Sequence, residues 1–271
     1  MFRALRRRLR QVQASFKKKD SENEPRVSFI VPCWNMAFDI PQTINSLLDQ
    51  TLKEIEIIVV DDGSTDHLVD LINHYSSKDK RVKYRAFFER GGAARCRNAG
   101  NKMAVAPIIC VCDAGDVYTK WRAEVVYKYF KKHKKVDVLC CACIHLGDDE
   151  LETCVMPRKY QGKLGERLKF EHPAVAYRRE VAIRWPYRED CLDTDQYDAF
   201  FFTLGKNGIK FGISDRIVTA KATRVIYSGG RDLNKARMKK LEIYREFKID
   251  IPKWLLEFEK NYREFCNVSH D

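Results

Sequence analysis

Residues 55–66 read IEIIVVDDGSTD, a mainly apolar run that ends abruptly in two aspartates and a glycine. A short run of this kind without turn residues is typical of a strand that is buried on both faces. Aspartate and glycine at its end favour a turn. Ligands of open parallel sheets bind outside the carboxyl ends of the strands, so the two aspartates are candidate ligand contacts. This stretch therefore predicts a core strand and the edge at which a binding site forms.

An alternation of strands and helices surrounds this stretch. Further strands are predicted at residues 27–31, where Pro32 is expected to end the strand, and at 82–87, 108–112 and 136–143. One helix is predicted from the apolar face that Ile40, Ile44, Leu47 and Leu48 form, and a second over about residues 92–106. A third is predicted to follow Thr119, which is expected to be its N-cap. Continuous apolar runs that alternate with helices predict an α/β fold with a mostly parallel central sheet flanked by helices.

The positive charge of the chain is concentrated at its start. The formal net charge is +12, and residues 1–19 carry eight lysines and arginines with no acid before Asp20. The small surplus that remains argues against a nucleic-acid partner. No apolar run reaches the roughly 18 residues of a membrane span, and no signal-peptide pattern follows the basic start, so we expect a cytoplasmic protein.

The basic start also has the pattern of an amphipathic helix. Its apolar face consists of Phe2, Leu5, Leu9, Val12 and Phe16. Three roles are open: binding an anionic membrane surface through residues 1–19, docking on a partner, or remaining a solvated arm. We expect four segments: a tail and linker (1–24), a first half of the α/β domain (25–118), a second half of the same domain (119–232) and a C-terminal helical segment (233–271).

The ten cysteines are expected to be reduced thiols that pack as small apolar groups, because no export signal precedes them. Residues 140–143 contain a CxxC spacing with His145 close by, and 110–112 make a CxC. Both groups lie in predicted strands, and no second CxxC completes a zinc site. A structural zinc site is therefore the less favoured interpretation.

Acidic clusters follow two of the predicted strands, at residues 61–66 and 113–116. One such cluster is explained equally well by the turn that aspartate and glycine favour. Two clusters at matching strand ends favour a shared ligand site.

Four motifs in this part of the chain occur together in one enzyme family. They are VSFIVPCWN (27–35), IEIIVVDDGSTD (55–66), GGAARCRNAG (91–100) and VCDAGD (111–116), and in this order they resemble the donor half of family 2 glycosyltransferases. EHPAVAYRREV (171–181) and PYREDCLDTDQYD (186–198) resemble the acceptor half of that family more weakly. The resemblance implies a GT-A fold, a nucleotide-sugar donor, commonly a UDP-sugar, and inversion at the anomeric carbon.

The resemblance also implies which residues contact the donor. Pro32 and Asn35 line the nucleotide pocket, and Asp62, with Asp61 beside it, holds the base and ribose. Arg97 touches the base or the phosphates, for which Arg95 is the less favoured candidate. Asp113 completes the set of nucleotide-sugar contacts.

A departing diphosphate accumulates negative charge, which Mg²⁺ or Mn²⁺ stabilises through oxygen ligands. The resembling family usually has D-x-D here, and Gly115 stands at the second acid. We expect Asp113 to contact the ribose or the metal. Asp116 either supplies the missing carboxylate or caps a helix. The predicted metal ligands are therefore Asp113 and Asp116.

A general base must take the proton of the acceptor hydroxyl. In the resembling family an acidic pair does this, and its aspartate falls on Asp195 or Gln196, depending on a one-residue gap. Glutamine cannot act as a base, so Asp195 is the first candidate, followed by Asp193 and then Asp198. The alternative is a solvated acidic start of a helix. His172 is expected to be structural, with a contact to phosphate or acceptor as the alternative.

The sequence therefore predicts a metal-dependent glycosyltransferase that acts on a cell-surface polysaccharide, a lipid-linked sugar or a protein glycan. A catalytically degenerate nucleotide-sugar-binding protein is the main alternative, because of Gly115. A sugar nucleotidyltransferase is less favoured, since VPCWN has neither a glycine-rich phosphate loop nor an activating lysine.

Overall fold

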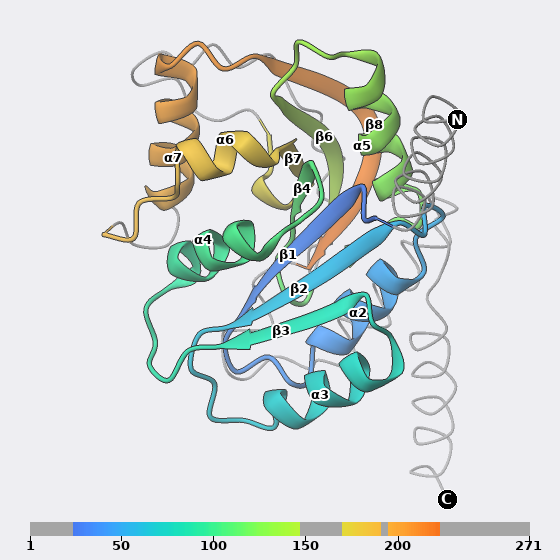
Figure 1. Ribbon diagram of the computed structural model, residues 1–271, viewed down its shortest axis with the longest axis vertical. Helices are drawn as coiled ribbons and strands as arrows, with labels where there is room; N and C mark the ends of the chain where they lie inside the picture. Colours follow the sequence, from blue (N-terminus) through green and yellow to red (C-terminus); the bar gives the residue numbers. More distant parts are fainter. Residues whose placement is uncertain (1–23, 147–169, 191–194, 223–271) are drawn as a thin grey trace, which may run out of the picture.

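The computed structural model describes residues 24–146, 170–190 and 195–222, whose strands form one eight-stranded sheet between helices (Figure 1). The amphipathic tail predicted within residues 1–24 and the helical segment predicted over 233–271 fall on residues outside this part, apart from residue 24. The division of the chain into four segments stays a prediction.

The first half of the chain alternates strands and helices as expected. It contains β1 (Val27–Cys33), α2 (Ile40–Leu48), β2 (Ile55–Asp61), α3 (Leu68–Lys78), β3 (Val82–Ala86), α4 (Ala93–Met103) and β4 (Ile108–Val111). The four strands are parallel, in the order β3-β2-β1-β4. The continuous apolar runs thus gave the correct pairing type, because strands connected through helices return in the same direction.

The second half adds antiparallel pairs to this sheet. It contains β5 (Val117–Tyr118), α5 (Arg122–Lys132), β6 (Val138–Leu146), the short 3₁₀ helix η1 (His172–Ala174), β7 (Val175–Arg178), α6 (Arg179–Arg184), α7 (Asp195–Lys206) and β8 (Phe211–Ala222). The sheet continues β4-β7-β6-β8-β5, and only β6 and β8 are parallel in this half. The α/β class with helices on both sides is confirmed, and the parallel character belongs mainly to the first half.

The helices form two layers (Figure 1). One core cluster joins the sheet to α2, α3 and α5, and the other joins it to α4, α6 and α7. Alternate residues of β1 enter the two clusters, so that Phe29 packs in the first and Ile30 in the second. Every residue of β1 and β2 is buried, as a strand between two helix layers requires.

The expectation that Pro32 ends the first strand is wrong, because β1 continues to Cys33. Successive residues of a parallel strand form backbone hydrogen bonds alternately with the two adjacent strands. Ile30 faces β4, as its carbonyl accepts from the Cys112 amide at 3.0 Å, and Pro32 faces the same side. Pairing with β4 ends at Ile30, so the missing amide hydrogen of Pro32 leaves no ladder bond unmade.

The expected helix cap at Thr119 is also wrong, and the alternative of a helix cap at Asp116 is excluded. The N-cap of α5 is Trp121, without a side-chain cap. Thr119 instead donates its hydroxyl toward the carbonyls of β8, at 3.4 Å from that of Val218. Asp116 precedes β5 and not a helix, since β5 begins at the next residue.

Helix α4 lies unusually close to the sheet, which places its first turns beside the strand ends. A Cβ atom at Gly100 would lie 2.5 Å from Cγ2 of Ile30, so only glycine permits this approach. The helix begins after Gly92, whose φ of 91° suits glycine. Arg95 and Arg97 in the first turns of α4 therefore come near the carboxyl ends of β1, β2 and β4.

The described cysteines are buried and form no disulfide, in agreement with the expectation of packed thiols. They are Cys33, Cys96, Cys110, Cys112, Cys140, Cys141 and Cys143. Burial raises the pKa of Cys110 to about 11, so this thiol is neutral at physiological pH. Within residues 24–146, 170–190 and 195–222, no helix has the length and apolar character needed to span a membrane.

Candidate functional site

Asp61 closes the turn at the end of β2. Its Oδ1 accepts hydrogen bonds from the amide and the hydroxyl of Ser64, at 2.9 and 2.6 Å, and its Oδ2 accepts from the Tyr84 hydroxyl at 2.7 Å. Burial and then Asp61 raise the pKa of Tyr84, so this phenol stays a donor. Asp61 therefore organises the DDGSTD turn from within.

Asp62 holds the loop that leads into α4. Its Oδ1 accepts from the Gly91 amide at 2.9 Å and from Nη2 of Arg95 at 3.0 Å, and its Oδ2 accepts from the Gly92 amide at 2.7 Å. Gly63 (φ 75°) allows the close approach, since a Cβ atom there would lie 3.0 Å from the carbonyl carbon of Glu89. Asp62, a residue that is 4% exposed, thus joins β2 to the start of α4 through its carboxylate.

The end of β1 is tied to the same turn. Asn35 adopts a φ of 50°, and its Oδ1 accepts from the Thr65 amide at 2.8 Å. The backbone amide of Asn35 donates to the Ser64 hydroxyl at 2.9 Å. Pro32 is buried in β1 and is paired with Val60. The structure therefore brings together the predicted contacts at the ends of β1 and β2.

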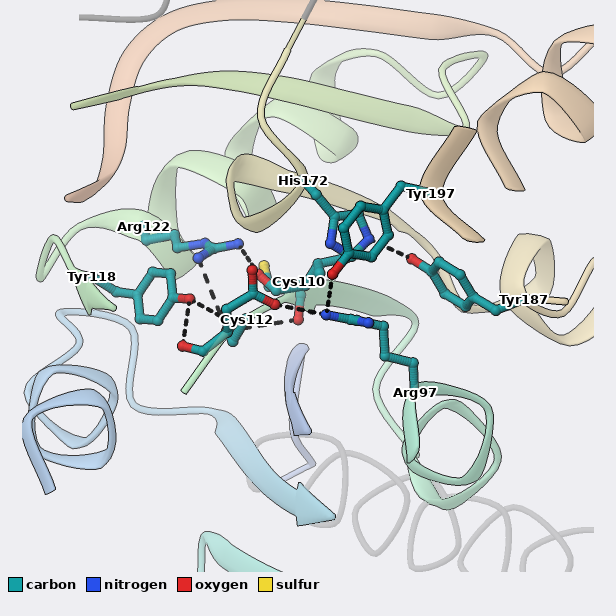
Figure 2. Close-up of polar contacts among 10 residues, drawn as sticks. Arg97, Cys110, Cys112, Tyr118, Arg122, His172, Tyr187 and Tyr197 are labelled. Atoms are coloured by element: carbon teal, nitrogen blue, oxygen red, sulfur yellow. Dashed lines mark hydrogen bonds and ion pairs between the residues drawn. The ribbon is translucent and has the colours of Figure 1, made fainter. Parts of the chain in front are cut away.

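Asp113 follows β4 and forms an ion pair with Arg97 of α4 (Figure 2). The Arg97 Nη2 lies 2.7 Å from Oδ1 of Asp113, and the side chains are 3% and 28% exposed. The Asp113 amide donates to the Tyr118 hydroxyl at 2.7 Å, and this hydroxyl donates to the Asp113 carbonyl at 3.3 Å. Both the side chain and the backbone of Asp113 are therefore fixed.

The structure explains why glycine occupies position 115. Gly115 has a φ of 92°, which L side chains rarely adopt, and a Cβ atom there would lie 3.2 Å from Cε of Met36. The Thr43 hydroxyl accepts from the Gly115 amide at 2.9 Å and donates to the Asp116 carbonyl at 2.8 Å. The turn is thus locked onto α2 in a shape that disfavours an acid at position 115.

Of the two acids after β4, Asp113 fits a metal site that relies on phosphate oxygens better than Asp116 does. Among the described residues, no group of three or more His, Cys, Asp or Glu side chains is placed to hold a metal ion. Mg²⁺ and Mn²⁺ commonly take only one or two protein carboxylates beside phosphates and water. Asp113, which is partly exposed, fits that pattern, whereas Asp116 is 4% exposed. Both assignments stay predictions.

The first candidate for the general base, Asp195, lies at the start of α7. Asp195 is the first residue of this helix, and Asp193 lies outside the described residues. Tyr197, two residues after Asp195, accepts a hydrogen bond from Nη2 of Arg97 at 3.1 Å. The first turn of α7 is therefore connected to the Arg97–Asp113 ion pair, although the choice of base stays a prediction.

His172 is buried among aromatic rings (Figure 2). Its ring stacks on Tyr197 with centroids 3.9 Å apart and an interplanar angle of 19°, and its Nε2 lies 3.0 Å from the Tyr187 hydroxyl. Tyr187 in turn stacks on Phe200 at 4.0 Å. Burial raises the pKa of Tyr187, so its hydroxyl keeps its proton. These contacts agree with the structural role expected for His172.

A second buried arginine, Arg122 of α5, lies beside Cys112, just after the end of β4 (Figure 2). Its Nη2 donates to the carbonyls of Val111 and Val175, at 2.6 and 3.4 Å. Its guanidinium carbon lies 4.5 Å from the ring centroid of Tyr118. Sequence reasoning missed Arg122, because a basic residue at a helix start is normally read as a surface cation.

Tyr118 and Tyr197 were missed as well. Tyr197 lies inside the quoted motif PYREDCLDTDQYD, and its position two residues after Asp195 was the available signal. Tyr118 follows VCDAGD closely, but nothing in the sequence indicates that its hydroxyl returns to the backbone of Asp113.

Comparison with known proteins gives a matching family profile and several similar curated proteins. The profile of glycosyl transferase family 2 matches residues 28–224. An uncharacterized glycosyltransferase of Methanocaldococcus jannaschii is 24% identical over 253 residues, which cover 90% of this chain and 83% of that protein. One of Rickettsia conorii is 36% identical over 112 residues, covering 41% and 18%. A putative teichuronic acid biosynthesis glycosyltransferase of Bacillus subtilis is 34% identical over 105 residues, covering 39% and 40%. The chain therefore spans less than half the length of two of these relatives.

Two solved structures share the fold. Staphylococcus aureus TarS 1-349 in complex with UDP superimposes with a TM-score of 0.63 at 20% identity, over 83% of this chain and 72% of that chain. The mannosyltransferase PcManGT from Pyrobaculum calidifontis, in complex with GDP-Man and Mn²⁺, gives 0.58 at 18% identity, over 87% and 69%. At these identities the likeness concerns the fold alone, and it confirms the GT-A architecture expected from the sequence.

Proposed function

This chain belongs to glycosyl transferase family 2, and from that premise we propose that it moves a sugar from a nucleotide-diphosphate donor, a UDP-sugar, to an acceptor hydroxyl with inversion. The observation that carries the proposal is the position of the acids at the strand ends. Asp62 and Asp113 are paired with Arg95 and Arg97, two residues apart at the start of α4. The two acidic clusters therefore lie at the same end of one helix.

The donor site consists of Pro32, Asn35, Asp61, Asp62, Arg97 and Asp113 in this proposal. Carboxylates accept hydrogen bonds from ribose hydroxyls and from N–H groups of a base. Asp62 already accepts two backbone amides and Arg95, so a nucleotide that bonds to it competes with the loop before α4. Direct contact between Arg97 and the nucleotide stays a prediction, since its Nη2 is engaged by Asp113 and Tyr197.

A divalent cation, Mg²⁺ or Mn²⁺, would be held by Asp113, with Asp116 as the second candidate. When bound, it would offset the charge that develops on the leaving diphosphate. The other functions belong to residues of this chain. The strand-end acids orient the donor, and Asp195 or Asp193 takes the proton of the acceptor hydroxyl.

The acceptor is a glycan or a lipid-linked sugar of the cell surface in this proposal. The relative from Bacillus subtilis, named for teichuronic acid biosynthesis, supports a cell-surface polymer. The basic residues 1–19 support a cytoplasmic enzyme that attaches peripherally to an anionic membrane surface.

The test is a donor panel. The protein is incubated with UDP- and GDP-sugars, Mn²⁺ and candidate acceptors, and the release of free nucleotide diphosphate is measured. Release from at least one donor is expected. If every combination of donor and acceptor leaves the nucleotide sugar intact, while UDP still binds, the chain is a degenerate binding protein and the proposal is wrong.

A matched pair of variants tests the role of Asp113. Calorimetry should find that Asp113→Asn loses Mn²⁺-dependent binding of UDP, because the amide carries no charge. Asp79→Asn is the control, since Asp79 also pairs with an arginine, Arg81 at 2.8 Å, at the end of α3. Equal binding by both variants would remove Asp113 from the metal site.

A further inference from the structure

We propose that Arg97 is a positioning residue, which fixes the carboxylate of Asp113 and the first turn of α7 relative to each other through Tyr197. This inference rests on the proposed function, since it assigns Asp113 to the donor side and α7 to the acceptor side. It differs from a direct contact between Arg97 and the nucleotide.

One nitrogen atom of Arg97 contacts both Asp113 and Tyr197. Nη2 of Arg97 donates to Oδ1 of Asp113 at 2.7 Å and to the Tyr197 hydroxyl at 3.1 Å. The guanidinium carbon also lies 5.0 Å from the ring centroid of Tyr197. Arg97 is only 2% exposed, so its charge depends on these partners. Burial alone lowers the pKa of Arg97, but Tyr197 and Asp113 outweigh it and raise that pKa.

Tyr197 is itself held in place by His172. His172 stacks on the Tyr197 ring, and Nε2 of His172 lies 3.0 Å from the Tyr187 hydroxyl. The backbone of Tyr187 returns to α4, because Asn98 accepts its amide and donates to its carbonyl, both at 2.9 Å. The contacts thus form a closed circuit from Arg97 back to the neighbouring residue Asn98. A closed circuit restricts each member more than a single contact does.

This circuit positions Asp113 relative to the first turn of α7. Asp113 is fixed through its backbone by Tyr118 and through its carboxylate by Arg97. Tyr197 stands two residues after Asp195, the first candidate for the general base. One guanidinium therefore sets the relation between the donor-side carboxylate and the helix that carries the candidate base. Small misplacements of reacting groups lower rates strongly, so this relation matters for turnover.

Two variants separate the two contacts of Arg97. Tyr197→Phe removes only the hydroxyl and leaves the ion pair, so we expect kcat to fall about tenfold with the donor KM within about twofold. Arg97→Lys keeps the charge but carries it on a shorter side chain with a single rotating ammonium group, so Asp113 is held less well and the donor KM rises about tenfold as well. The double variant should be no worse than Arg97→Lys, because both changes break one circuit.

Tyr75→Phe is the matched control, since its hydroxyl bonds to Asn45 at 3.1 Å between α2 and α3. Its kcat and KM should equal those of the wild type. If Tyr197→Phe lowers only the melting temperature and leaves kcat unchanged, Tyr197 is merely structural and the inference is wrong. The same holds if the effects of Tyr197→Phe and Arg97→Lys on kcat are additive.

Failure of the proposed function is distinguishable from failure of this inference. If the wild type releases no nucleotide from any donor, the proposed function fails. Calorimetry of Mn²⁺ and UDP then still tests the positioning of Asp113: binding about tenfold weaker in Arg97→Lys supports it, and unchanged binding overturns it.

Discussion

Two buried arginines, Arg97 and Arg122, contact residues at or just after the end of β4, and the protein surrounds them differently (Figure 2). Arg122 is fully buried and contacts backbone carbonyls and the rings of Tyr118 and Phe29, with no carboxylate partner among the described residues. Arg97 is almost as buried but is paired with the carboxylate of Asp113, which is 28% exposed.

The difference indicates different roles. The carbonyls that hold Arg122 belong to β4 and to the first residue of β7, so they cannot move without the sheet. Arg122 therefore ties these two strands together and contributes to the fold. The carboxylate that holds Arg97 belongs to the candidate site and reaches solvent, so a bound ligand can compete for it. Arg97 therefore connects the fold to the site.

The largest effect on stability is expected for Arg122→Met. The methionine fills part of the volume, but the carbonyls of Val111 and Val175 lose their charged donor inside the core. Leaving buried acceptors unsatisfied should lower the free energy of unfolding by about 3 kcal/mol. Urea denaturation measures this loss.

Arg184→Met is the control for Arg122→Met, because Arg184 is exposed on α6. Its free energy of unfolding should stay within about 0.5 kcal/mol of the wild type. A stability of Arg122→Met equal to that of this control would refute the structural role of Arg122.

A smaller loss of stability is expected for Arg97→Met. Asp113 is then unpaired, but its partial exposure allows water to solvate it, so the loss should be about 2 kcal/mol. In the double variant Arg97→Met/Asp113→Asn, no unpaired charge remains, and part of the loss should be recovered. A double-mutant cycle by urea denaturation measures this coupling, and additive losses would contradict the ion pair.

The acidic residues at the strand ends could be predicted from the sequence, but the residues that contact them in the fold could not. Apolar runs that end in aspartate place Asp61 and Asp113 at the carboxyl ends of β2 and β4, as the structure confirms. The registers of β1 with β2 and β4 then bring these ends to one edge. Local pattern suffices here, because each strand and its following turn are encoded within a few residues.

The partners of these acids depend on contacts between distant parts of the chain. Strand β7 enters the sheet between β4 and β6, although β6 precedes it in sequence, and no local pattern fixes that order. Arg97 and Tyr197 meet across 100 residues. The missing acid at Gly115 was visible in the sequence, but its reason, a φ of 92° in a turn locked onto α2, appears only in three dimensions.

Glu56 gives the smallest effect and extends the comparison to a buried anion. It lies near the start of β2, is 1% exposed, and accepts from the Ser28 hydroxyl at 2.5 Å and from the amides of Val105 and Ala106. Lys83, 2.6 Å away, is partly exposed. Like Arg122, Glu56 is held by fixed groups of the fold, so Glu56→Gln should cost stability, about 1 kcal/mol, without changing donor KM.

The pH dependence of that cost tests the charge of Glu56. Burial alone raises the pKa of Glu56, but hydrogen bonds from Lys83, Ser28 and the two amides outweigh it and lower that pKa below its ordinary value of 4.5. The stabilisation is therefore present above pH 4.5 and is lost as the pH falls through the lower folded-state pKa. The difference in unfolding free energy between wild type and Glu56→Gln should be constant from pH 8 to about pH 5 and shrink below it. A difference that stays the same down to pH 3 would mean that shape, and not charge, holds this end of the sheet.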